Sequence, residues 1–105
     1  MLRVKDAQKS VHFYRDILGM NIAKQIDLPQ YKFSLYFMSH CPAGIESPSD
    51  YFDPVIELTH NHGTEDQADF KYHNGNSTEN GALQGFGHTG FLVDDLDAAC
   101  AWLEE

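Results

Sequence analysis

Short stretches of alternating, β-branched and aromatic residues recur along the chain, and turn-forming residues separate them. This pattern is typical of β-strands that bury one face. The predicted strands span residues 2–4, 21–26, 31–39, 55–59 and 86–93. The third strand shows the alternation most clearly, because Phe33, Leu35 and Phe37 fall on the same face. The chain is therefore expected to contain a sheet with one apolar side.

Two other stretches have the period of an α-helix. Residues 7–18 place Val11 and Leu18 on one apolar stripe, with Asp6 as the expected N-cap and Gly19 as the residue that ends the helix. The stripe of a final helix, capped by Asp94 or Asp95, consists of Leu96, Ala99, Cys100 and Leu103. Strands and helices together predict an α+β fold.

The strand over residues 55–59 is the centre of the sequence, because it carries a carboxylate among apolar neighbours. Alternation puts Glu57 and Thr59 on one face and Leu58 and His60 on the other. Glu57 is then either on a solvated face or held inward by a cation, since carboxylates are rarely buried unless they are paired. Taken alone, the strand favours the solvated face.

The final strand and helix repeat the pattern of the first strand and helix. Six residues near the start match six near the end at the spacing that separates Asp6 from Asp95. The pairs are Val4 with Val93, Asp6 with Asp95, Ser10 with Ala99, Val11 with Cys100, Phe13 with Trp102, and Tyr14 with Leu103. Any capped amphipathic helix could show a similar pattern, but two copies of a strand–helix–three-strand module explain it better.

The repeat divides the chain into a complete first module, a connection and the start of a second module. The first βαβββ module is expected over residues 1–62 and a polar connecting loop over 63–85. Residues 86–105 would supply only the strand and helix of the second module, so the second module is incomplete in this chain. A site built from equivalent positions of both modules would be half present.

Composition narrows the class of partner. The 105 residues suit one small domain, and 16 acidic against 7 basic residues give a net charge of −9. That charge argues against nucleic acid and anionic membrane as partners. Cys41 and Cys100 form no CxxC motif and are expected to be free thiols in a reducing cytoplasm, with Cys41 in a loop and Cys100 in the core.

Glu57 and His88 are the candidate metal ligands. Each lies in a strand context of apolar or small residues, and carboxylate oxygen and imidazole nitrogen are ordinary ligands of zinc and similar divalent ions. His60, His62 and His73 are rival candidates. His88 is preferred over them because it alone lies between glycines inside a predicted strand.

Several segments together resemble the glyoxalase I (lactoylglutathione lyase) family. They are Leu2–Asp6, Ser10–Tyr14, Leu18–Met20, Lys32–Phe37, Glu57–Asn61, Gly63–Glu65, Tyr72–Asn76 and Gly85–His88, and they cover nearly the whole chain in order. The long insertion over residues 72–85 resembles the eukaryote-type, zinc-using branch. The resemblance implies paired βαβββ modules and isomerisation of the methylglyoxal–glutathione hemithioacetal to S-lactoylglutathione.

The same resemblance assigns roles to residues. Glu57 and His88 match two of four metal ligands, for Zn²⁺ or for Ni²⁺ or another divalent ion. The remaining two, a glutamine and the glutamate that acts as catalytic base, are expected two residues before Met1 and beyond Glu105, so no catalytic base is assigned within the chain. The residues that match the substrate site are Arg3 and Asn61 for glutathione, and Ile26, Leu28, Leu35 and Phe37 for the S-substituent.

Three positions depart from the family pattern, and two other functions stay open. Gln84 stands where an arginine is usual, His62 replaces an aromatic residue and Thr89 replaces an apolar one. The 105-residue chain alone is expected to be inactive, and a homodimer could complete sites across an interface. The alternatives are a non-catalytic small-molecule-binding module of the same fold, and an acidic domain whose Glu57 and His88 are merely solvated.

Overall fold

A computed structural model describes residues 1–40 and 54–105. The chain forms two compact units, Met1–Tyr72 and His73–Glu105, and each is described by itself. The predicted loop over residues 40–54 and its Cys41 fall largely outside the described residues. Among the described residues, no helix has the length and apolar character that crossing a bilayer requires.

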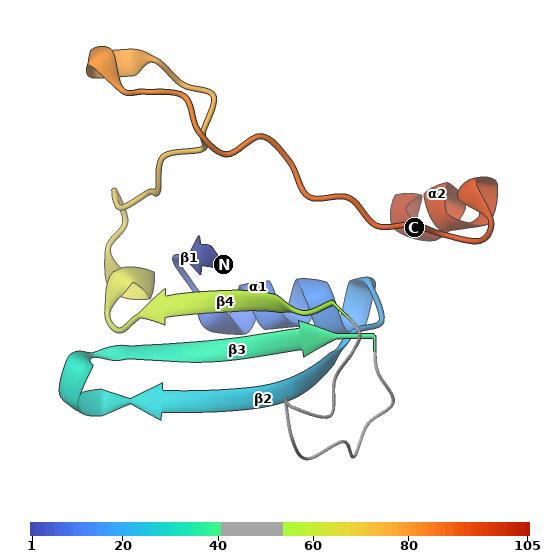
Figure 1. Ribbon diagram of the computed structural model, residues 1–105, viewed down its shortest axis with the longest axis horizontal. Coiled ribbons are helices and arrows are strands. Elements are labelled where there is room, and N and C mark those ends of the chain that lie inside the picture. The colour runs from blue at the N-terminus through green and yellow to red at the C-terminus, as the bar shows by residue number, and fades with distance from the viewer. Residues whose placement is uncertain (41–53) are drawn as a thin grey trace. The chain divides into compact units, whose positions relative to one another are not determined.

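The first unit is a four-stranded mixed sheet with one helix (Figure 1). Its strands are β1 (Leu2–Val4), β2 (Asn21–Leu28), β3 (Phe33–Ser39) and β4 (Ile56–Asn61). They are ordered β1-β4-β3-β2 across the sheet. Strand β1 is parallel to β4, whereas the other two pairs are antiparallel. The unit thus has the expected βαβββ element order, and the α+β class is confirmed.

The predicted strands of this unit all form, with small differences at their ends. β2 extends to Leu28 and β3 begins at Phe33, because the link between them is only a 3₁₀ turn (Pro29–Tyr31) and Lys32. Lys32 adopts a left-handed conformation with φ 59°. β4 extends to Asn61, since its last residues pair with β3 and its Thr59 and His60 also pair with β1. The pairing partners set these ends.

Helix α1 (Ala7–His12) is capped as the sequence predicts. The Asp6 side chain accepts a hydrogen bond from the Lys9 backbone N–H at 3.2 Å, which satisfies one of the free donors at the helix start. The helical path continues as a π turn over Phe13–Ile17 and ends at Gly19, which has φ 75°. The predicted helix over residues 7–18 is therefore confirmed, with a wider final turn.

The core lies between α1 and one face of the sheet. Met38 of β3 and Leu58 of β4 are fully buried and pack with Val11 of α1 and with Met20. Burial of each such side chain stabilises the fold by roughly 1.5–3 kcal/mol. The alternating residues of the same strands, Phe37 and Glu57 among them, must then face away from α1.

The second unit contains η5 (Glu79–Gly81) and helix α2 (Leu96–Glu104) but no described strand. The predicted strand over residues 86–93 is wrong for this structure. A strand needs a neighbour to pair its backbone groups, and none is described within this unit. The prediction that Cys100 is a core residue is also wrong, because Cys100 is exposed and no residue of α2 is buried.

The caps of the two helices nevertheless have the same conformation. Asp6 has φ −134° and ψ 108°, and Asp95 has φ −134° and ψ 107°. The Asp95 side chain accepts from the Ala98 N–H at 2.9 Å, as Asp6 does from the Lys9 N–H. The repeat seen in the sequence therefore reappears in the local geometry of the two helix starts.

The two caps make a matched pair of variants. We expect Asp6→Ala to lower the free energy of unfolding of the first unit by about 1 kcal/mol, because it leaves a helix N–H without its partner. Asp95→Ala should leave that free energy unchanged and reduce only the helicity of α2, since α2 buries no residue. Urea unfolding, followed through an NMR signal of the buried Leu58, measures the free energy of unfolding of the first unit in both variants. An equal loss in the two variants would contradict this account.

Candidate substrate and metal site

The strand register brings most of the predicted site residues to one face of the sheet. Directly paired residues project to the same side, so each pair of partners shares a face. The relevant pairs are Arg3 with Thr59, Leu35 with Thr59, Phe37 with Glu57, Phe33 with Asn61, Ile26 with Leu35, and Leu28 with Phe33. All six predicted substrate-site residues and Glu57 consequently lie on the face turned away from α1.

A pocket of about 330 Å³ opens on this face. Its lining consists of Met1, Arg3, Phe33, Leu35, Glu57, Thr59 and Asn61. Four of these lining residues were predicted from the sequence. Three other predicted residues, Ile26, Leu28 and Phe37, lie on the same face but do not line the pocket. Phe33 was missed as a site residue, although its alternation with Leu35 could have indicated it.

Glu57 lies in this pocket as a half-buried carboxylate. Its neighbour Thr59 is buried and donates a hydrogen bond to Glu57 Oε1 at 3.5 Å. No ion pair to Glu57 is found among the described residues. A half-buried carboxylate with one long hydrogen bond retains acceptor capacity, and carboxylate oxygen suits zinc and other divalent ions. The chemistry of Glu57 therefore fits a role as one metal ligand.

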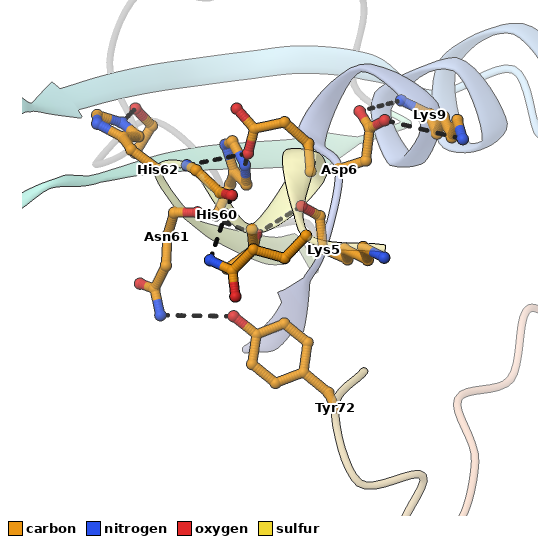
Figure 2. Close-up of polar contacts among 12 residues, drawn as sticks. Lys5, Asp6, Lys9, His60, Asn61, His62 and Tyr72 are labelled. Carbon is orange, nitrogen blue, oxygen red and sulfur yellow. Dashed lines mark hydrogen bonds and ion pairs between the residues drawn. The ribbon is translucent and has the colours of Figure 1, made fainter. Parts of the chain in front are cut away.

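Arg3 and Asn61 supply polar groups at the same pocket. Arg3 is exposed, and its guanidinium offers five N–H donors to an anionic ligand. Figure 2 shows the Asn61 side chain directed at Tyr72, whose hydroxyl accepts from Asn61 Nδ2 at 3.4 Å. Tyr72 is in turn packed edge-on against Phe70, with ring centroids 4.8 Å apart. Asn61 is thus oriented by contacts outside the pocket.

The turn after β4 fixes one end of the site. Glu65 Oε2 lies 2.7 Å from His60 Nε2 and accepts from the Gly63 N–H at 3.0 Å (Figure 2). The Glu65 backbone N–H, the His60 side chain and the Gly63 N–H hold the pKa of the Glu65 carboxyl below its ordinary value. The Thr64 hydroxyl donates to the Lys5 carbonyl at 2.6 Å, which ties this turn to the segment after β1.

The rival histidines have other partners. His60 is buried and bonded to Glu65, and His62 Nε2 lies 2.8 Å from the Ser34 hydroxyl. His73 belongs to the second unit, where its ring contacts the Ser77 carbonyl. Within residues 1–40 and 54–105, no three His, Cys, Asp or Glu residues are grouped to hold a metal ion.

His88 also belongs to the second unit, where it is exposed in a segment without regular structure. A metal ion shared by Glu57 and His88 therefore stays a prediction. Gln84, in place of the usual arginine, donates to the Asn76 carbonyl at 3.3 Å. That bond keeps Gln84 within its own loop.

Known proteins are similar to this chain in sequence and in fold. A lactoylglutathione lyase of Pseudomonas putida is 45% identical over 112 residues, which cover 99% of this chain and 62% of that protein. Glyoxalase I of Saccharomyces cerevisiae is 41% identical over 109 residues, covering 98% of this chain and 32% of the yeast protein. The structure of the trypanothione-dependent glyoxalase I of Leishmania major matches with a TM-score of 0.68 at 27% identity, covering 99% of this chain and 61% of that one.

The chain spans about three fifths of the length of the bacterial relative. The family-level match, by contrast, extends over residues 1–105. Sequence, fold and the residues gathered on the sheet face agree with it. The chain belongs to the Glyoxalase/Bleomycin resistance protein/Dioxygenase superfamily.

Proposed function

We propose that this chain contributes the first half of a glyoxalase I (lactoylglutathione lyase) site. The reaction would isomerise the hemithioacetal of methylglyoxal and glutathione to S-lactoylglutathione. The observation that carries the proposal is the shared sheet face, where Arg3, Asn61 and Glu57 line one pocket. Relatives named lactoylglutathione lyase at 41–45% identity support the same activity.

Arg3 and Asn61 would bind the glutathione part of the substrate. Glutathione carries carboxylates, and a guanidinium pairs with a carboxylate through charge-assisted hydrogen bonds. The apolar side chains on the same face, Ile26, Leu28, Leu35 and Phe37, would contact the S-substituent. Their partial burial on an open face leaves apolar surface that a ligand can cover.

Glu57 and His88 would hold the metal ion, which we propose is Zn²⁺, with Ni²⁺ or another divalent ion as the alternative. The ion, when bound, would supply Lewis-acid stabilisation of charge on the substrate oxygens. Glu57 would provide a fixed anionic ligand from the sheet, oriented by the Thr59 hydroxyl. No residue of this chain is assigned the proton-transferring role.

The module boundaries remain part of this proposal. Residues 1–62 would form the first module, 63–85 the connecting loop and 86–105 the start of the second. The matching caps at Asp6 and Asp95 support two related modules. A second chain could complete the site in a homodimer, and free Cys100 and the acidic composition suit a cytoplasmic protein.

Ligand binding by the chain tests the substrate assignment. We expect S-alkylated glutathione to bind the 105-residue chain and shift NMR signals of the pocket residues. Arg3→Ala should raise the Kd roughly tenfold or more, since a hydrogen bond to a charged group contributes about 1.5–3 kcal/mol. Lys24→Ala is the matched control, because exposed Lys24 pairs with Phe37 on β3 but does not line the pocket.

An equal rise in Kd for Arg3→Ala and Lys24→Ala would indicate attraction by any cation and contradict the assignment. Unchanged binding in Arg3→Ala would contradict it too.

Metal binding tests the ligand assignment. We expect the 105-residue chain to bind zinc weakly in equilibrium dialysis, because two protein ligands leave much of the coordination shell to water, whereas catalytic zinc sites use three. Glu57→Gln and His88→Ala should each reduce that binding. Glu79→Gln, which removes an exposed carboxylate outside the proposed set, should not. Tight zinc binding that Glu57→Gln leaves intact would refute the assignment.

Activity tests whether a residue of this chain can carry the proton-transferring role. We expect the zinc-supplied 105-residue chain to form S-lactoylglutathione at most very slowly, because a positioned acid–base group typically contributes about 10²–10⁴-fold. The ultraviolet absorbance of S-lactoylglutathione measures the rate. Rapid turnover by this chain would show that one of its own residues moves the proton.

A further inference from the structure

The loop that opens the second unit places reactive groups around the bond between Asn74 and Gly75. His73 Nδ1 accepts a hydrogen bond from the Gly75 backbone N–H at 3.1 Å. His73 Nε2 lies 2.6 Å from the Ser77 carbonyl oxygen, which can only accept. The ring is therefore the tautomer with its proton on Nε2, and the unprotonated Nδ1 is directed at the Gly75 N–H.

The Asn74 side chain is folded forward onto the backbone of the residues that follow Gly75. Its Oδ1 accepts from the Asn76 N–H at 2.9 Å and from the Ser77 N–H at 2.8 Å. To reach these two donors, the carboxamide must point forward along the chain, past Gly75. Two backbone N–H groups on one carbonyl oxygen polarise that carbonyl and stabilise negative charge that develops on it.

Gly75 is held in this arrangement by the loop. It is buried and has φ 85°, and a Cβ at this position would collide with the Phe86 carbonyl oxygen. The Gly75 carbonyl also accepts from the Gly85 N–H at 2.9 Å. Only glycine fits there, and the absence of a side chain leaves its nitrogen open to the neighbouring carboxamide. His73 and Asn74 are exposed, so water reaches the site.

We propose that Asn74 is a site of self-catalysed deamidation, with His73 as the general base. The Gly75 nitrogen gives its proton to His73 Nδ1 and forms a bond to Cγ of Asn74, while the Asn76 and Ser77 N–H groups hold the oxyanion. The His73 imidazolium then returns this proton to the Asn74 side-chain nitrogen, directly or through water, and the nitrogen leaves as ammonia, which gives a succinimide. Water then opens this ring to aspartate or isoaspartate, so the net change is amide plus water to carboxylate plus ammonium.

The His73 ring is well arranged for this role. Its Nε2–H bond to the Ser77 carbonyl fixes the ring orientation and stabilises the imidazolium that forms when Nδ1 takes the proton. His73 would act directly in catalysis, because its Nδ1 accepts a hydrogen bond from the reacting Gly75 nitrogen.

The chain carries its own reference in Asn80–Gly81. The dipeptide is the same, but the Gly81 N–H donates to the Thr78 carbonyl at 3.2 Å inside η5. A carbonyl oxygen is a much weaker base than imidazole. The native chain should therefore deamidate at Asn74 about tenfold or more faster than at Asn80, which needs only part of the roughly 10²–10⁴-fold that general acid–base catalysis typically contributes.

The experiment incubates the 105-residue chain and follows both sites by mass spectrometry after cleavage at glutamate. Glu79 lies between the two asparagines and so separates them into different peptides. His73→Ala should slow deamidation at Asn74 about tenfold or more and leave Asn80 unchanged. A merely structural His73 predicts the opposite, because loosening the loop frees Asn74 to react faster. Incubation in denaturant should make the two sites react at similar rates.

Asn74→Asp supplies the product for comparison, and its circular dichroism shows whether the loop tolerates the change. A faster or unchanged rate at Asn74 in His73→Ala would overturn the proposal. Equal rates at Asn74 and Asn80 in the native chain would overturn it as well.

Discussion

The pairing of β3 with β4 is the constraint on which the rest of the structure depends. Phe37 lies opposite Glu57 and Leu35 opposite Thr59, while the alternate residue Leu58 enters the core. A slip of one residue would turn Leu58 to the open face and Glu57 toward α1. That exchange would lose the burial of Leu58 and bury an uncompensated carboxylate. The core and the pocket therefore both require the same register of β3 on β4.

The open face follows from the same constraint. On one side of the sheet, apolar residues are buried against α1. On the other side, half-buried apolar side chains surround Glu57. Thr64 ties the turn after β4 to the segment after β1, and the His60–Glu65 pair ties the same turn back to β4. These polar contacts add to the short strand pairing with β1 at the end of β4, where Asn61 lies.

The two related helices show how far local interactions reach. Asp6 and Asp95 cap their helices with the same geometry, because a side-chain oxygen and an N–H three residues on need no other part of the fold. Their surroundings differ completely. Val11 is buried against the sheet, whereas its counterpart Cys100 is exposed. Capping starts a helix, but burial requires a partner surface.

The sequence by itself determined what alternation and capping encode. It predicted the four strands of the first unit, the Asp6 cap, a second cap at Asp94 or Asp95, and the face that Leu35 shares with Phe37, since each depends on neighbours in the chain. Tertiary structure decided where β2 ends and β3 begins, which of those face residues line the pocket, and that Phe33 joins them. It also decided that residues 86–93 form no strand, because a ladder of hydrogen bonds needs a second chain segment that local sequence cannot supply.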